Sequence, residues 1–270
     1  MKTFCAFLFL VSVAVVFNSC AGNKQILQHT GDDKRFNYAP LWAAMYQQKA
    51  SEYKALTLQA YNIAYERLDG YIKQQAGKPQ AVITDIDETV LDNSPYTVHQ
   101  ALLEQGYSDN TWKEWTARVD CDTVPGALSF FKYAASKKVE VFYISNRLKE
   151  ETPQTLANLR KWNFPFADEA HLLLKTTTSS KDARRAQVRE NYNVLMLFGD
   201  NLGDFEGIYD KRPTETRDSL VRANTASFGS RFIVLPNPMY GEWMNALIHY
   251  HYTATPQLQA DTATSVLKNY

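Results

Sequence analysis

The chain has 270 residues, enough for one large domain with a substantial core or for one domain with a small cap. Its 29 Lys and Arg residues balance 29 Asp and Glu residues, so the formal net charge is zero. A neutral chain without a long basic run argues against a broad nucleic-acid-binding surface, and we expect no nucleic-acid polymer as a partner.

The first 20 residues have the pattern of a targeting segment. An apolar run over residues 4–17 is too short for a comfortable transmembrane helix but suits the core of a signal peptide. Cys20 then stands among small residues, as in a bacterial lipoprotein box, although Phe17 replaces the leucine that is usual three positions before the cysteine. We expect a lipoprotein signal peptide over residues 1–20, a lipid on Cys20 and an outer-membrane location in the cell envelope. Plain secretion is the alternative.

Cysteine usage agrees with export. Removal of the signal and lipidation of Cys20 would leave Cys121 as the only free cysteine, so we expect no internal disulfide. We interpret Cys121 as a small residue in a partly buried loop rather than as a reactive thiol. Residues 21–40 are polar and typical of a tether, and we expect the folded domain over residues 41–270.

The first part of this domain is predicted to be helical. Residues 41–75 have apolar side chains at three- and four-residue spacing, which predicts one long helix or two helices. A buried strand over residues 81–84 runs directly into Asp85 and Asp87. Residues 93–123 are rich in aromatic side chains and are expected to be irregular. Because they lie between this strand and the next helix, we expect them to overhang the strand end, forming a small, mainly helical cap with residues 41–75.

Strands and helices alternate in the rest of the chain. Further strands are predicted over residues 139–144, 171–174, 194–198 and 232–235. Helices are predicted over residues 126–137 and after Thr152, which suits an N-cap. Ser179 and Asp182 resemble a capping box, which would put Lys181 in the first turn of another helix. This alternation predicts an α/β fold with a doubly wound parallel, Rossmann-like sheet.

Polar side chains follow three of these strands. Open parallel sheets place their sites beyond the carboxyl ends of the strands. The groups expected there are Asp85 and Asp87, then Ser145 and Asn146, then Asp200 and Asp204, with Lys181 at a helix start between the last two strands. Attack on a phosphoryl group needs a nucleophile, a divalent cation that offsets repulsion between anions, and donors that hold the equatorial oxygens.

These residues suit such a site. Asp85 fits the nucleophile and Asp87 the general acid and base. The phosphate cradle would comprise Ser145, Asn146 and Lys181. Asp85 and Asp200 would hold the metal, and oxygen ligands that include carboxylates favour Mg²⁺ over zinc.

Other interpretations fail on spacing. The alternating aspartates resemble EF-hand ligands, but Val90 stands where that loop needs glycine and Tyr96 where it needs glutamate. The sequence has no nucleophile-elbow serine motif, and Ala127 stands where a cysteine phosphatase centred on Cys121 would need arginine.

In order along the chain, these residues match the four motifs of the haloacid dehalogenase superfamily. The motifs are DIDET from Asp85, SN from Ser145, Lys181, and GDNLGD from Gly199. Ser145 replaces the threonine of many members, a hydroxyl for a hydroxyl. Longer strings are similar to those of the class C nonspecific acid phosphatases, a lipoprotein 5'-nucleotidase family of bacterial envelopes, and the similarity covers residues 42–246. These strings are ITDIDETVLDNSPY, VFYISNR, SSKDARR, GDNLGDF and FIVLPNPMYGEW.

The resemblance implies a role for each matched residue. Asp85 would attack the phosphoryl group and form an aspartyl-phosphate, and Asp87 would protonate the leaving oxygen and then activate water. Mg²⁺ would be held by the Asp85 carboxylate, the Asp87 backbone carbonyl and Asp200. Asp204 would lie behind these ligands, either bound through water or orienting Lys181.

The substrate is less well defined. Trp112, Tyr240 and Tyr96 are candidates to stack on a nucleobase, as aromatic side chains of the resembled family do, or else these rings pack the cap against the sheet. Glu88 and Arg147 either support the site or are structural. We expect a metal-dependent phosphomonoesterase acting on nucleoside monophosphates and aryl phosphates. Phosphoryl transfer to an alcohol and a non-catalytic haem-binding or adhesive lipoprotein are the alternatives, and the oligomeric state stays open, a homodimer being one option.

Overall fold

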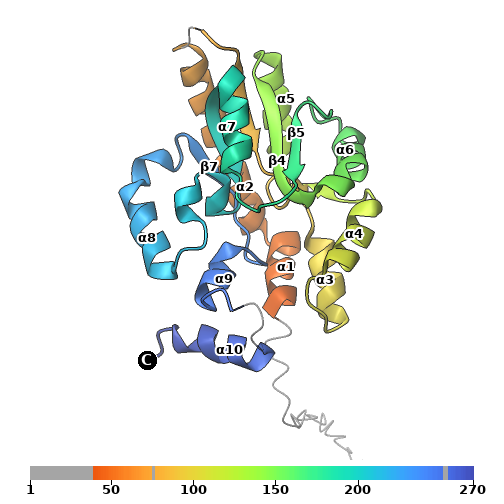
Figure 1. Cartoon of the computed structure of the whole chain (residues 1–270), viewed down its shortest axis with the longest axis vertical. Helices are drawn as coiled ribbons and strands as arrows, with labels where there is room; N and C mark the ends of the chain where they lie inside the picture. The colour runs from red at the N-terminus through yellow and green to blue at the C-terminus, as the bar shows by residue number, and fades with distance from the viewer. Residues whose placement is uncertain (1–38, 75–76, 252–254) are drawn as a thin grey trace, which may run out of the picture. The chain divides into compact units, whose positions relative to one another are not determined.

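A parallel sheet of five strands forms the centre of the fold. The computed structural model describes residues 39–74, 77–251 and 255–270. The strand order is β5-β4-β1-β6-β7, so β1 lies in the middle, and Figure 1 labels β4, β5 and β7 of this sheet. Every neighbouring pair is parallel, which confirms the predicted doubly wound α/β fold. The strands are β1 (Gln80–Thr84), β4 (Glu140–Leu148), β5 (Leu172–Lys175), β6 (Asn193–Gly199) and β7 (Phe232–Val234).

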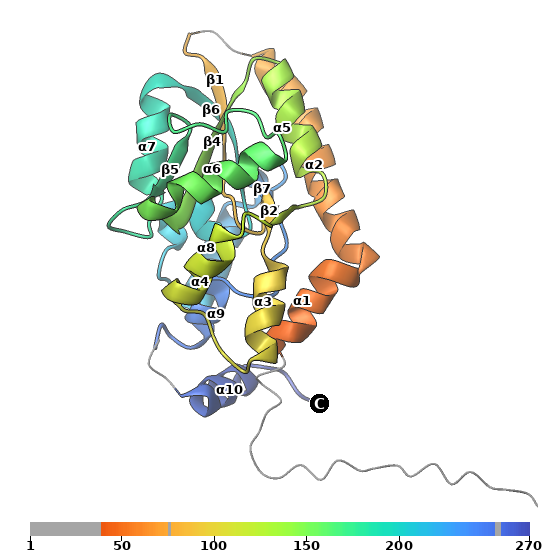
Figure 2. The same ribbon diagram turned by 90° about the vertical axis from the view of Figure 1, so that its right-hand side faces the viewer.

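Helices cover both faces of this sheet. Val82 of β1 belongs to a core cluster shared with α2 (Ser51–Ile72) and α5 (Ala127–Ser136). Ala81 and Ile83 belong to a second cluster, which includes α7 (Asp182–Asn191) on the opposite face (Figure 2). Successive side chains of a strand point to opposite faces, and both faces are covered here, so β1 reads as an unbroken apolar run.

The remaining elements surround this core. Further helices are α1 (Ala39–Lys49), α3 (Ser94–Leu102), α4 (Asp109–Ala117), α6 (Thr152–Lys161), α8 (Thr214–Ala223), α9 (Glu242–Leu247) and α10 (Pro256–Ser265). Short 3₁₀ turns are η2 (Lys149–Glu151), η3 (Leu202–Asp204), η4 (Gly207–Tyr209) and η5 (Thr225–Ser227), and β2 (Leu91–Asp92) pairs antiparallel with β3 (Asp122–Thr123). Across the described ranges, we find no helix with the length and apolar character needed to span a membrane.

The expectation that residues 93–123 are irregular is wrong, because the segment contains α3 and α4. Pro95 lies in the first turn of α3, where its missing N–H leaves no bond unmade. Ser108 caps α4 by accepting a hydrogen bond from the backbone N–H of Thr111 at 3.2 Å. Each helix has only 9 residues, too few for a clear apolar period.

The two helices at the start of the expected cap lie in different environments. The described part of residues 41–75 contains two helices: α2 packs in the core against the sheet, whereas α1 lies beside α3 (Figure 2). The cap boundary over residues 41–75 and 93–123 stays a prediction. The signal peptide over residues 1–20, the lipid on Cys20 and nearly all of the tether lie outside the described residues.

Two helices begin one residue away from the expected position. Thr152 is the first residue of α6 and not its N-cap. Lys181 immediately precedes α7 instead of lying in its first turn, and Ser180 rather than Ser179 accepts the backbone N–H of Asp182, at 3.5 Å. The structure therefore places Lys181 at the edge of the helix, beside the loops at the carboxyl end of the sheet.

Candidate active site

Three predicted site residues meet beyond the carboxyl end of β1. Lys181 Nζ lies 2.6 Å from Asp204 Oδ1 and also donates to Asp85 Oδ1. All three side chains are buried. A buried charge is strongly unfavourable unless it is paired, so the one ammonium group stabilises both carboxylates and fixes their positions.

A group of three carboxylates could hold a metal ion. Asp85, Asp200 and Asp204 have oxygen atoms that all lie within 4.8 Å of one another. Burial raises the pKa of Asp85 to about 7, against the lowering effect of Lys181. Burial, Asp204 and Asp85 together raise the pKa of Asp200 well above its usual value. A divalent cation would offset this repulsion, and the hard oxygen donors suit Mg²⁺.

Asp204, which we expected behind the ligands, thus belongs to the same group as Asp85 and Asp200. Its Oδ2 accepts the backbone N–H of Asn201 at 2.9 Å. A Cβ added to Gly199, the last residue of β6, would lie 2.3 Å from the Asp204 Cβ, so only glycine leaves room there. Asn237, which was not predicted as a site residue, donates from Nδ2 to Asp200 Oδ2 at 2.8 Å.

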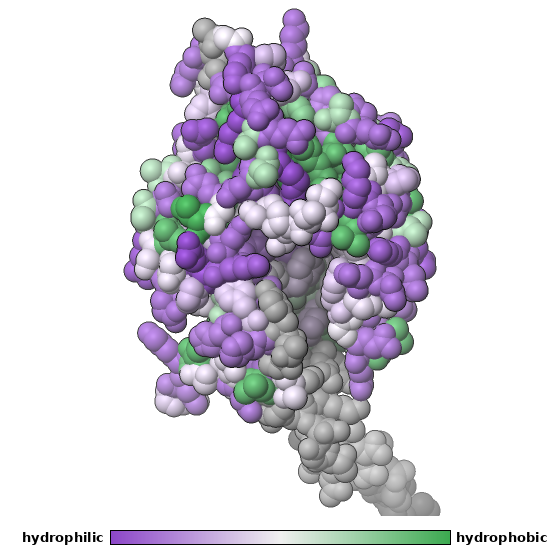
Figure 3. Space-filling model, in the orientation of Figure 1, coloured by the Kyte–Doolittle hydropathy of each residue, from purple (hydrophilic) through white to green (hydrophobic). Residues whose placement is uncertain are grey.

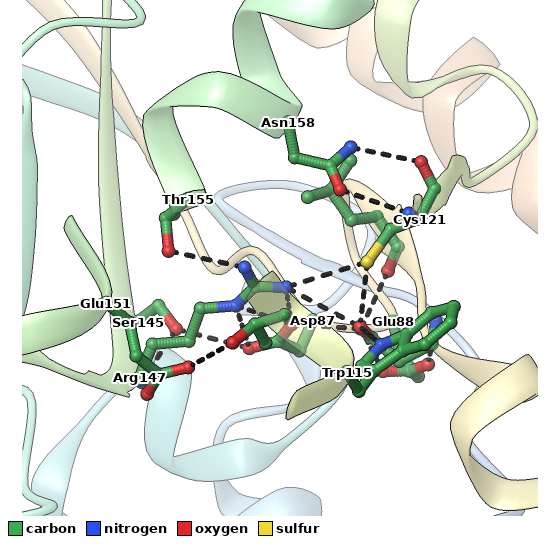
Figure 4. Close-up of polar contacts among 12 residues, drawn as sticks. Asp87, Glu88, Trp115, Cys121, Ser145, Arg147, Glu151, Thr155 and Asn158 are labelled. Atoms are coloured by element: carbon green, nitrogen blue, oxygen red, sulfur yellow. Dashed lines mark hydrogen bonds and ion pairs between the residues drawn. The ribbon is translucent and has the colours of Figure 1, made fainter. Parts of the chain in front are cut away.

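The carboxylate of Asp87 is held by three side chains, of which Arg147 and Ser145 are labelled in Figure 4. Arg147 Nη2 and Nε lie 2.8 and 3.0 Å from Asp87 Oδ1, and Asn93 Nδ2 donates to the same oxygen at 2.9 Å. Ser145 Oγ lies 3.3 Å from Asp87 Oδ2. Asp87 is not part of the three-carboxylate group, and the metal contact through its backbone carbonyl that the resemblance implies stays a prediction. The sequence left the role of Arg147 open and did not indicate Asn93.

Two residues of the predicted phosphate cradle contact an arginine that was not predicted as a site residue. Ser145 is buried in β4 and Asn146 is exposed beside it. Arg184 of α7 donates from Nη1 to the Ser145 carbonyl at 2.6 Å and from Nη2 to Asn146 Oδ1 at 2.7 Å. This contact turns the Nδ2 amide of Asn146 into the group that can donate to an anion. Arg184 lies one turn after Lys181 in the SSKDARR string, and that spacing was the available signal.

Two of the aromatic residues expected to bind substrate are largely buried. Trp112 is 9% exposed, and its ring packs edge-on against Tyr96 at a centroid distance of 5.1 Å. The guanidinium carbon of Arg147 lies 5.8 Å from the centre of the Trp112 ring. Packing of the cap, the alternative weighed from the sequence, therefore describes the present contacts of Trp112 and Tyr96, and their stacking on a nucleobase stays a prediction.

Tyr240 has a different environment. Its ring is half-buried, and its hydroxyl donates to Oε2 of Glu88, the residue after Asp87. Glu88 is buried with a left-handed φ of 58°, and burial together with Asp87 raises its pKa to about 8. A bulky residue keeps this conformation only where its surroundings enforce it. Glu88 thus ties the loop after β1 to the segment that carries Tyr240.

Cys121 lies beside this site without the properties of a nucleophile. Its side chain is buried, and its thiol donates to Asn93 Oδ1 at 3.2 Å. Burial raises the thiol pKa to about 12, so almost no thiolate forms at neutral pH. This environment agrees with the packing role that we expected.

Comparison with known proteins gives concordant matches. Residues 21–243 match the family described as HAD superfamily, subfamily IIIB (acid phosphatase). The chain is 26% identical over 200 residues to a stem 31 kDa glycoprotein of Glycine max, covering 72% of this chain and 69% of that protein. It is also 26% identical over 166 residues to acid phosphatase 1 of Solanum lycopersicum, covering 58% of this chain and 57% of that protein.

Solved structures show the same fold over most of the chain. The class C acid phosphatase from Bacillus anthracis superposes with a TM-score of 0.84 at 35% identity, covering 87% of this chain and 99% of that one. A second structure of that phosphatase, with tungstate bound, gives a TM-score of 0.84 at 35% identity and covers 88% and 99%.

Proposed function

This chain belongs to the acid phosphatases of haloacid dehalogenase subfamily IIIB, and from that premise we propose that it hydrolyses phosphomonoesters through a phosphoryl group held covalently on Asp85. The chain is a phosphatase by family. The observation that carries the finer proposal is the contact of Lys181 with both Asp85 and Asp204 within the three-carboxylate group.

Asp85 is the nucleophile in this proposal. Its carboxylate is buried at the strand end, and the ammonium group of Lys181 holds it in one orientation. Asp85, Asp200 and Asp204 would hold Mg²⁺, which when bound offsets the repulsion between the carboxylate and a phosphate anion. Lys181, Ser145 and the Asn146 amide hold the equatorial phosphate oxygens as charge shifts onto them.

Asp87 moves the proton. As the bond between phosphorus and the leaving oxygen breaks, the Asp87 carboxyl gives its proton to that oxygen and becomes a carboxylate. In the second half-reaction this carboxylate takes a proton from the water that attacks the phosphoryl group on Asp85. Phosphate then leaves, and both aspartates return to their starting states.

Nucleoside monophosphates and aryl phosphates are the substrates that we propose. Tyr240 supports this choice, because its half-buried ring is tied to the residue next to the acid and can contact a flat leaving group. Trp112 and Tyr96 would contribute only after the contacts around α4 change. Measuring phosphate release from nucleoside 5'-monophosphates, 4-nitrophenyl phosphate and sugar phosphates would rank these classes.

The mechanism is tested with Asp85→Asn and with metal removal. Asp85→Asn, or chelation followed by dialysis, should abolish phosphate release, and added Mg²⁺ should restore only the chelated wild type. Acid-quenched wild-type protein should carry a phosphoryl group on the peptide that contains Asp85. Asp218→Asn, a change at an exposed aspartate of α8, is the matched control and should keep full activity. Activity that survives both treatments would refute the mechanism.

We further propose that Cys20 carries lipid and anchors the enzyme in the cell envelope. The apolar run and the small residues around Cys20 support this proposal. Mass spectrometry of the N-terminal peptide of the native protein should show acyl chains, and Cys20→Ala should release the enzyme from the membrane fraction. An unmodified Cys20, or membrane retention of the variant, would refute the anchor.

A further inference from the structure

The two oxygens of the Asp87 carboxylate are bound unequally. Oδ1 accepts three close hydrogen bonds, from Arg147 Nη2 at 2.8 Å, Asn93 Nδ2 at 2.9 Å and Arg147 Nε at 3.0 Å. Oδ2 shares the Arg147 Nε donor at 3.2 Å and lies 3.3 Å from Ser145 Oγ. A carboxylate oxygen has about two lone-pair sites, and Arg147 Nη2 and Asn93 Nδ2 fill both of them at Oδ1, so Oδ2 is the oxygen that can carry a proton.

Arg147 is held in place on its other sides. Its side chain is 1% exposed, and Nη1 donates to Thr155 Oγ1 of α6 at 3.3 Å. The face of the guanidinium packs on the Trp112 ring. These contacts come from α4 and α6, so the plane of the guanidinium, and with it the orientation of the Asp87 carboxylate, is set by elements outside the loop that carries the acid.

Asn93 is fixed in one amide orientation. Its Oδ1 accepts from Trp115 Nε1 at 2.9 Å, a group that can only donate, and from the Cys121 thiol at 3.2 Å. Its backbone N–H donates to Glu88 Oε1 at 2.8 Å. The amide nitrogen Nδ2 is therefore forced to face Asp87, and Asn93 acts together with Arg147 on the same oxygen.

We propose that Arg147 and Asn93 are positioning residues that occupy Asp87 Oδ1 and leave Oδ2 as the atom that donates the proton to the leaving oxygen. This inference rests on the role of Asp87 in the proposed function. In the step, the phosphorus–oxygen bond breaks, its electron pair stays on the leaving oxygen, and the Oδ2 proton moves to that oxygen. The guanidinium then faces the carboxylate that has formed, and charge-assisted hydrogen bonds stabilise it.

The dependence of kcat/KM on the leaving group can distinguish a residue that positions the proton donor from a residue that only stabilises the fold. A nitrophenolate leaves without protonation, whereas a benzyl alkoxide needs a proton. We compare kcat/KM for 4-nitrophenyl phosphate and 4-nitrobenzyl phosphate, because kcat/KM covers the step in which the leaving group departs. Arg147→Lys keeps the positive charge but loses the planar guanidinium, whose N–H groups bind the Asp87 carboxylate at two points. It should lower kcat/KM about 10- to 100-fold for the benzyl ester and only about threefold for the phenyl ester.

Controls distinguish the outcomes. Thr155→Val, a milder change that frees Nη1 of Arg147, should shift the same ratio in the same direction by a smaller factor. Arg217→Lys, at a buried arginine paired with Glu242 away from Asp87, should leave the ratio unchanged. Equal losses on both esters in Arg147→Lys would overturn the inference. In the Asp87→Asn background, Arg147→Lys should add no further loss on the benzyl ester, because the proton donor is already absent.

Asp87→Asn alone shows which idea fails. A selective loss on the benzyl ester in Asp87→Asn, with equal losses on both esters in Arg147→Lys, would reject the positioning role and leave the proposed function standing. Equal losses in Asp87→Asn as well would reject the assignment of Asp87 as the acid and the inference with it.

Discussion

Replacing Asp200 with asparagine should stabilise the metal-free protein while removing its response to metal. The amide keeps the shape of the side chain and an oxygen that can accept from Asn237 Nδ2, now at 2.8 Å. It removes one negative charge from the group in which Asp85, Asp200 and Asp204 lie within 4.8 Å of one another. The change therefore relieves repulsion that only a bound cation otherwise offsets.

The direction of the effect follows from the raised pKa of Asp200, because burial and the neighbouring carboxylates disfavour its ionised form in the folded protein. Relief of an uncompensated charge is among the larger effects of a single substitution, so we expect Asp200→Asn to raise the free energy of unfolding at neutral pH by about 1–3 kcal/mol without metal, or Tm by about 3–10 °C. Saturating Mg²⁺ at about 100 times Kd should stabilise the wild type by about 2.7 kcal/mol and the variant by much less.

The pH dependence has a defined sign. Because the folded-state pKa of Asp200 is raised, the unfolded chain loses its proton first as the pH rises through about 4, and the folded wild type loses stability relative to it. The penalty is absent below that pH and complete above the folded-state pKa. The advantage of Asp200→Asn should therefore be small at about pH 4 and largest at neutral pH.

Thermal unfolding of both proteins, with chelator and with Mg²⁺, at acidic and neutral pH, measures the stability without metal, the gain from Mg²⁺ and the pH dependence. Asp218→Asn removes an exposed aspartate and should change Tm little under any of these conditions. An Asp200→Asn protein that is no more stable than wild type without metal, or that gains as much from Mg²⁺, would refute the account of the carboxylate group.

Three further predictions concern the surroundings of the site. Tyr61→Phe should lower the free energy of unfolding in urea by about 1–3 kcal/mol, because the Tyr61 hydroxyl donates to the buried Thr89 carbonyl at 2.7 Å; an unchanged stability would contradict this. Gly199→Ala should lower kcat/KM about tenfold or more, since the added Cβ must displace Asp204, and an equally active variant would show that Asp204 can move freely. The buried thiol of Cys121, with its pKa of about 12, should react with a thiol reagent only after unfolding. Reaction in the native protein at the rate of a free thiol would refute that burial.

Local patterns predicted most of the sheet. The apolar runs that became β1, β4, β5, β6 and β7 were all recognisable, because a strand buried on both faces needs an unbroken run of apolar residues. The short helices α3 and α4 were not recognised, since 9 residues give too little periodicity. Strand order was not predictable either, because it depends on which strands pair across the whole chain.

Some residues of the candidate site were likewise predictable from the sequence, and others were not. The sequence by itself determined that Asp85 and Asp87 follow a buried strand and that Asp200 and Lys181 stand where other elements of a parallel sheet begin or end, because those positions are set by local patterns and by the topology of such sheets. The meeting of Lys181 with Asp85, 96 residues apart, was expected from that topology.

Only the tertiary structure decided which groups hold Asp87. Arg147 lies 60 residues after it, and Arg147 reaches Asp87 because β4 pairs with β1 in one particular register. The Asn93 amide nitrogen faces Asp87 because Trp115 Nε1, which can only donate, occupies the amide oxygen. Sequence motifs do not predict such contacts, because the contacts depend on how α4 and α6 pack over the end of the sheet. Packing brings together side chains that have no regular spacing in the sequence.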